Sequence, residues 1–176
     1  LADLIEIQQK ELAEIQTKEI GMLFWYSFWG IGGTIKLTRW FANNFESILA
    51  NEIQTAEWMQ FEYQYDPLGI IYGIAPWNFP FNQVLRAAIP NILAGNTTIY
   101  KHASNTPLAW QKIESLFREA GFPEGIYQNI FISNSESEYI ISREEIKWVN
   151  ITASEWAGRN IGSLAWKYLK PSVLEL

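Results

Sequence analysis

Hydrophobic and polar positions follow several different patterns along the chain. Over residues 1–20 apolar side chains recur at helical spacing between Glu, Gln and Lys, and the spacing resumes over 34–49. Residues 51–65 are polar and aromatic, which is typical of a hairpin or an arm. Residues 22–33 are apolar without a 3.6-residue stripe. The first third therefore predicts amphipathic helices, an arm and one segment of undefined role.

From residue 66 onward, short apolar runs alternate with longer helical patterns. The run Gly69–Ala75 is unbroken and rich in β-branched side chains, which is typical of a strand buried on both faces. Further strands are predicted at 97–101, 127–132, 147–152 and 172–176, with helices ending near 95 and spanning about 106–120, 136–141 and 154–168. Such alternation predicts an α/β fold with a doubly wound parallel sheet. We expect a helical region and arm over 1–65 and a ligand-binding domain over 66–176.

Composition narrows the chemistry. The chain has 176 residues, no Cys, one His and a net charge of −6. Because the chain has no Cys, it has no disulfide, no thiolate metal site and no thiol nucleophile. With a single His, we also expect no His-based metal site. The negative charge argues against nucleic acid. The longest apolar run is shorter than the roughly 20 residues that span a bilayer. We expect a cytoplasmic protein without membrane contact and, because the first residue is Leu rather than Met, a piece of a longer sequence.

Polar residues stand just past the ends of predicted strands, where βαβ units bind ligands. Asn78 lies in the corner Pro76–Pro80, and its amide either donates to a developing oxyanion or caps the next helix. The ammonium of Lys101 either meets ribose hydroxyls or a phosphate, or emerges into solvent. Glu175 lies in an apolar run, where desolvation suits a general base, or it is a strand-end residue facing water.

Particular motifs carry a family resemblance. The corner P-W-N-F-P, the later A-G-N and Lys101 resemble the aldehyde dehydrogenase superfamily. K-H-A-S at 101–104 and E-A-G-F-P-E-G at 119–125 are closer to its succinate-semialdehyde branch. The resemblance implies a Rossmann-like domain and NAD(P)-dependent oxidation of an aldehyde, succinate semialdehyde in that branch, through a catalytic Cys. Because this chain has no Cys, we expect an amino-terminal fragment that lacks the catalytic thiol domain and is inactive alone.

The resemblance also implies roles for individual residues. Catalytic roles fall on Asn78, which stabilises the oxyanion, and on Glu175, which activates water. The implied cofactor-binding residues are Pro76, Trp77, Asn78, Lys101, His102, Ser104, Ala153 and Ser154. Ser104 stands where many NAD-preferring relatives have an acid, so NADP is the expected cofactor and NAD the alternative. Ala153 replaces a Gly of the family, and its methyl group crowds the expected phosphate position.

Three interpretations remain open. The chain is an enzyme whose thiol comes from a separate chain, a nucleotide-binding module without catalysis, or a decayed gene product. The expected partners are a small-molecule aldehyde and a second copy of the chain. The apolar segment Met22–Gly33 helps to choose among these three interpretations, because the resembled family has a polar helix at this place. This segment either fills the core or has degenerated, and the second interpretation is favoured; if exposed, it is a patch that promotes association.

Overall fold

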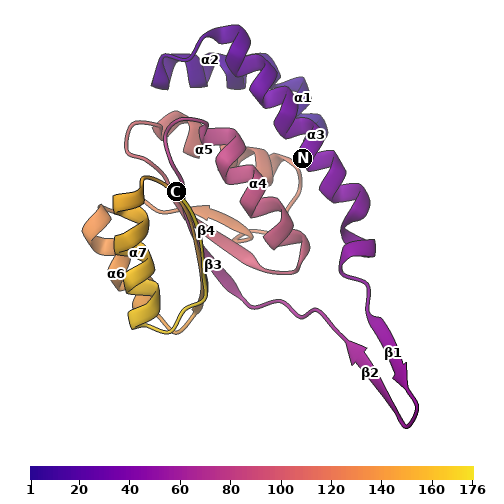
Figure 1. The fold of residues 1–176 in the computed structure, drawn as a ribbon. Coiled ribbons are helices and arrows are strands. Elements are labelled where there is room, and N and C mark those ends of the chain that lie inside the picture. The colour runs from indigo at the N-terminus through magenta and orange to yellow at the C-terminus, as the bar shows by residue number, and fades with distance from the viewer.

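Five parallel strands form the centre of the computed structural model, which describes residues 1–176 (Figure 1). Their order is β5-β4-β3-β6-β7, with bounds β3 Ile70–Ile74, β4 Thr97–Lys101, β5 Tyr127–Asn129, β6 Ile146–Thr152 and β7 Ser172–Glu175. Helices α4 (Pro80–Leu93) and α5 (Pro107–Glu119) cover one face. Helices α6 (Ser137–Ser142) and α7 (Glu155–Lys167) cover the other. The prediction of a doubly wound α/β sheet is confirmed.

Burial on both faces explains the unbroken apolar run of β3. Successive side chains of a strand point to opposite faces, and Ile71 and Tyr72 are both fully buried. A core of 18 buried residues lies on the side of α4 and α5. A second core of seven, Tyr72 among them, lies on the side of α6 and α7. The element ends differ little from expectation, except that β5 stops at Asn129 rather than at residue 132.

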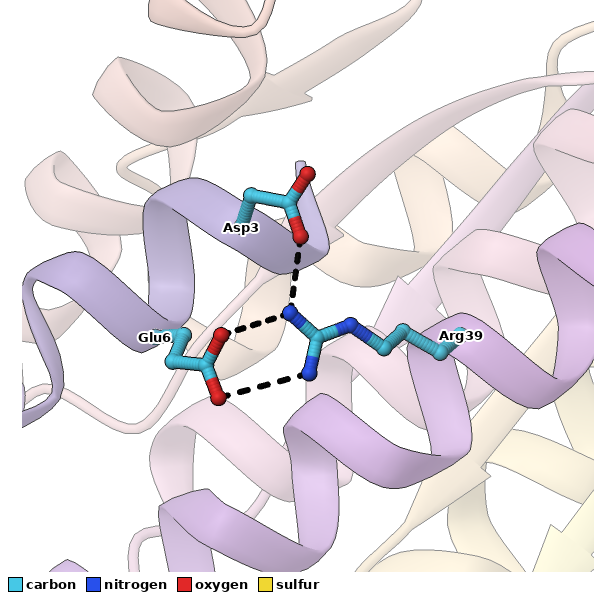
Figure 2. Close-up of polar contacts among 3 residues, drawn as sticks. All are labelled: Asp3, Glu6 and Arg39. Carbon is cyan, nitrogen blue, oxygen red and sulfur yellow. Dashed lines mark hydrogen bonds and ion pairs between the residues drawn. The ribbon is translucent and has the colours of Figure 1, made fainter.

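Three further helices, α1 (Ala2–Ile7), α2 (Gln9–Ile20) and α3 (Phe24–Ile48), form an outer layer over α4 and α5 (Figure 1). The helix expected over 1–20 is interrupted at Gln8. Arg39 of α3 joins this layer together, because its guanidinium lies 2.7 Å from a carboxylate oxygen of Asp3 and 2.6 Å from one of Glu6 (Figure 2). The guanidinium lowers the pKa of both carboxyls.

The segment Met22–Gly33 belongs mostly to α3, a continuous 25-residue helix. Its buried side chains include Ser27 and Ile31, whereas Trp25 and Trp29 are 61% and 68% exposed. Filling of the core is therefore wrong for these large aromatic side chains. Leu23 and Tyr26, also near the amino end of α3, are exposed as well.

The arm predicted over 51–65 is an antiparallel hairpin of β1 (Glu52–Ala56) and β2 (Met59–Tyr63). Every residue of both strands is exposed, and the hairpin projects away from the other elements (Figure 1). None of the helices has both the length and the apolar character that a membrane crossing requires. No cluster of three or more His, Asp or Glu side chains is arranged to hold a metal ion.

Candidate functional site

A cleft of about 830 Å³ lies where β3, β4, β6 and β7 end. Its walls are the loops that follow β3, β4 and β6, the segment 132–134 after β5, and the end of β7. All nine residues singled out from the sequence line this one cleft: Pro76, Trp77, Asn78, Lys101, His102, Ser104, Ala153, Ser154 and Glu175. Parallel strands bring their carboxyl ends to the same edge, which is why residues 99 positions apart meet.

Asn78 lies in the corner between β3 and α4, with its side chain exposed to the cleft. The residue that caps α4 is Phe79, and no side chain accepts a hydrogen bond from the first turn. The capping interpretation of Asn78 is therefore wrong. Its amide makes no hydrogen bond within the protein and remains able to donate to a ligand oxygen.

Lys101 ends β4 and is only 8% exposed, so the interpretation of a side chain emerging into solvent is wrong. No carboxylate of the protein pairs with its ammonium. Burial is the cause of its lowered pKa, and no neighbouring charge offsets that effect. A desolvated cation without a partner is costly. A ligand that brings hydroxyl or phosphate oxygens into the cleft would relieve that cost.

His102 is buried beside Lys101 and linked to β5. Its Nε2 lies 3.0 Å from the Tyr127 hydroxyl and 2.9 Å from Oδ1 of Asn129. The Asn129 amide nitrogen donates to the Trp110 carbonyl and to Glu114, so Oδ1 is the acceptor and His102 carries its proton on Nε2. Burial lowers the pKa of His102 to about 3. The ring is therefore neutral at physiological pH, which excludes a cationic role.

The loop between β6 and α7 supplies Ala153 and Ser154. The Ser154 hydroxyl oxygen caps α7 by accepting from the amide of Ala157 at 3.4 Å. Its proton stays available to a ligand. The Ala153 amide donates to the backbone oxygen of Glu175 at 3.1 Å, so that amide is already used within the sheet. Ser154 can therefore contact an anion, whereas the backbone nitrogen of Ala153 cannot.

Glu175 reaches the cleft from β7 and pairs with Arg86 of α4. Its side chain is 52% exposed, so the burial expected from its apolar neighbours is absent. The Thr152 hydroxyl also donates to it, at 3.2 Å. A guanidinium and a hydroxyl both stabilise the charged carboxylate. The structure therefore presents Glu175 as a carboxylate held in place at the rim, with a hydrogen-bond acceptor facing the cleft.

The sequence patterns did not indicate three other residues of the site, Gln83, Arg86 and Trp110. Gln83 and Trp110 line the cleft, from the first turns of α4 and α5. Arg86 orients Glu175. The charge of Arg86 inside an apolar helix was a usable signal, because such a charge needs a partner. Trp110 resembled any other core residue of an amphipathic helix, and only the fold places it against His102.

Known proteins resemble this chain over nearly its whole length. The family model "Aldehyde dehydrogenase family" matches residues 1–176. A probable NADP(+) succinate-semialdehyde dehydrogenase of Synechocystis is 37% identical over 175 residues, which are 99% of this chain and 38% of that protein. A Mycobacterium ulcerans succinate-semialdehyde dehydrogenase [NADP(+)] 1 is 35% identical over 178 residues, 39% of its length. The chain thus spans less than two fifths of the curated relatives it matches.

Among solved structures, the succinic semialdehyde dehydrogenase of Streptococcus pyogenes, crystallised in complex with NADP+, superposes with a TM-score of 0.97. It is 32% identical, and the match covers 99% of this chain and 38% of that one. The agreement extends over the outer helices, the hairpin and the sheet, because nearly all of the chain takes part.

Proposed function

The chain belongs to the aldehyde dehydrogenase family, and we propose on this premise that it is the cofactor-binding part of an NADP-dependent succinate-semialdehyde dehydrogenase. Two relatives of over 30% identity carry that name, and a third was crystallised with NADP+. The proposed substrate is succinate semialdehyde and the proposed product is the acid. The exposed Ser104 supports NADP, because a small neutral side chain does not repel a 2′-phosphate.

The unpaired ammonium of Lys101 is the observation that carries the proposal. A dinucleotide supplies the hydroxyl and phosphate oxygens that this desolvated cation lacks. Lys101 and Ser104 would hold the ribose end of the cofactor. Ser154, at the amino end of α7, would hold the pyrophosphate. When bound, the cofactor supplies a nicotinamide ring that accepts hydride from the substrate carbon.

Two further polar residues of the cleft, Asn78 and Glu175, suit stabilisation of the oxyanion and activation of water. The free amide of Asn78 would donate to the oxyanion that forms on the aldehyde oxygen. The Glu175 carboxylate would accept a proton from water, after rotating away from Arg86. These residues contain no thiol, and covalent catalysis needs a nucleophile. We therefore expect the chain alone to bind the cofactor without turning over the aldehyde.

Isothermal titration calorimetry tests the proposal directly. We expect NADP to bind more tightly than NAD, and Lys101→Met to weaken NADP binding by about tenfold, since charge-assisted hydrogen bonds contribute about 1.5–3 kcal/mol. The matched control Lys36→Met removes an exposed lysine on α3 and should leave the affinity unchanged. Absence of NADP binding to the folded wild-type chain would refute the proposal. Cofactor reduction by the chain alone with succinate semialdehyde would refute its expected inactivity.

A second candidate function is a nucleotide-binding module without catalysis, favoured by the absence of Cys from these residues. Mixing the chain with a separately expressed Cys-bearing remainder of a relative separates the two. Restored reduction of NADP in the mixture supports the dehydrogenase. Cofactor binding that never leads to turnover in the mixture supports the module.

A further inference from the structure

We propose that Glu19 of the outer layer is a positioning residue for the cofactor cleft. It lies in the last turn of α2, and its carboxylate fixes the amino end of α5 and with it the cleft loop 101–106. This inference rests on the proposed function only for the identity of the ligand. The structural coupling itself can be measured without any cofactor.

The contact is a helix cap contributed from 89 residues away. The amide of Leu108 donates to Oε1 of Glu19 at 2.5 Å, and the amide of Ala109 donates to Oε2 at 3.1 Å. The first amides of a helix have no partner within the helix. Thr106 occupies the cap position, yet its side chain makes no capping hydrogen bond. Pro107 has no N–H to satisfy. Both carboxylate oxygens of Glu19 are therefore used on the first turn of α5.

The Thr106 hydroxyl is unavailable because it has other partners. It donates to the carbonyl of Ala103 at 3.1 Å and accepts from the indole nitrogen of Trp110 at 2.8 Å. These bonds tie the loop to the first turn of α5. The Thr106 hydroxyl is therefore engaged within the loop and with Trp110 rather than in capping α5.

Glu19 is also unusual in its electrostatic surroundings. The side chain is partly buried and forms no ion pair, and burial raises its pKa. The two backbone amides are the groups that oppose this effect. The amino end of a helix stabilises a nearby carboxylate through its dipole and free N–H groups. The negative charge of Glu19 is thus stabilised by the amino end of α5.

From the first turns of α5 the contacts continue to the cleft. The Trp110 ring stacks on His102, with centroids 5.3 Å apart. The Trp110 carbonyl and the Glu114 carboxylate both accept from the side-chain nitrogen of Asn129, at 2.7 and 2.8 Å. The Asn129 oxygen in turn contacts His102, which follows Lys101 in the chain. A shift of the start of α5 would therefore move Trp110 and His102, which line the same cleft as Lys101.

Two other polar pairs join the outer helices to α5 away from the cleft and provide matched controls. Lys112 pairs with Glu11 at 2.9 Å, and Gln8 donates to Glu119 at 2.9 Å. Neither pair touches an amide of the first turn of α5. If the interface merely holds the helices together, loss of Glu11 and loss of Glu19 should have the same kind of effect.

Hydrogen–deuterium exchange on Glu19→Gln, Glu19→Ala and Glu11→Gln tests the proposal. We expect both Glu19 variants to exchange the Thr106 amide, which donates to the carbonyl of Ala103 at 3.2 Å, about tenfold faster, because a cap and helix-dipole interaction is lost. Glu11→Gln should leave this exchange unchanged. Glu19→Gln keeps the size of the side chain, so it reports on the cap if Glu19→Ala fails to fold. Calorimetry should show the NADP dissociation constant rising about fivefold to tenfold in Glu19→Gln and not in Glu11→Gln.

The outcomes separate the two proposals. If only Leu108 and Ala109 exchange faster while the Thr106 amide stays protected, Glu19 is a local cap and the inference is overturned. Equal effects of Glu11→Gln and Glu19→Gln would overturn it as well. If the wild type binds no NADP but the loop responds to Glu19 alone, the proposed function fails and the positioning role of Glu19 stands.

Discussion

The outer helix α3 and the central sheet differ in which side chains they bury. In the sheet and its helices the buried side chains are largely the apolar ones, such as Ile71, Val149 and Ile113. In the interface of α3 the buried stripe combines Ile31 and Ile35 with three hydroxyl residues, Ser27, Thr34 and Thr38, while large aromatic residues of the same helix remain exposed. Hydrophobicity alone therefore predicts the buried side chains of α3 less well than those of the strands.

Close helix packing accounts for the difference. The Ser27 hydroxyl donates to the carbonyl of Ala13 on α2 at 3.3 Å, so the two helices meet across small side chains. On the other side, Thr34 accepts from Asn82 of α4 at 3.1 Å. A helix held between two neighbours needs small residues that satisfy their own hydrogen bonds. Four substitutions test this comparison, in order of decreasing expected effect.

Gly73→Ala should be the most damaging. A Cβ at this position of β3 would lie 2.2 Å from the ring of Tyr100, which is fully buried and cannot move aside. We expect a loss of about 3 kcal/mol in the free energy of unfolding, measured by urea titration. The matched change Gly33→Ala in α3 meets no atom within 4 Å and should stabilise by about 0.5–1 kcal/mol. Similar effects of the two substitutions would contradict the comparison.

Ser27→Leu tests the small-residue interface of α3. The side chain is fully buried against α2, so a larger apolar group must force the helices apart and leaves the site overpacked. We expect a loss of about 2 kcal/mol, from the same urea titration. Stabilisation by the added apolar surface would show that α3 follows the same rule as the sheet.

His102→Gln should change the pH dependence of stability. The folded pKa is lowered to about 3 from 6.5, so the unfolded chain binds the proton more readily. The stabilising contribution is complete above pH 6.5 and is lost as the pH falls toward 3. Between pH 6.5 and 5.5 the wild type should lose about 1 kcal/mol through this group. The buried hydroxyls of α3 do not titrate, so Ser27→Ala should retain the wild-type slope; an equally steep slope in His102→Gln would rule out this assignment.

Trp29→Gln should have the smallest effect. The side chain is 68% exposed, and surface substitutions usually change stability by less than about 0.5 kcal/mol. Thermal unfolding should give nearly the wild-type midpoint, although an aromatic residue of a helix has been made polar. A loss of unfolding free energy comparable to that of Ser27→Leu would mean that the exposed Trp29 side chain contributes to folding.

Much of the candidate site was predictable because strand ends are visible in sequence. The apolar runs ending at Ala75 and Lys101 place Asn78 and Lys101 at one sheet edge, and the structure puts both in one cleft. Whether Asn78 caps a helix or remains free could not be read from spacing, because Phe79 competes for the same position. The charge of Arg86 inside an apolar helix indicates that the side chain has a partner, but no local pattern identifies that partner as Glu175 of β7.

The sequence by itself determined the α/β class, the order of the strands along the chain and the hairpin arm, since strand runs and turn residues are encoded locally. The predicted strand ends also indicated Asn78, Lys101 and Glu175, whereas the other cleft residues were implied by the family resemblance of the motifs. The tertiary structure alone decided that Trp25 and Trp29 face water and that Glu19 caps α5. Both depend on which helix lies against which. The arrangement of the helices results from packing between segments far apart in the chain, and no local pattern of residues predicts it.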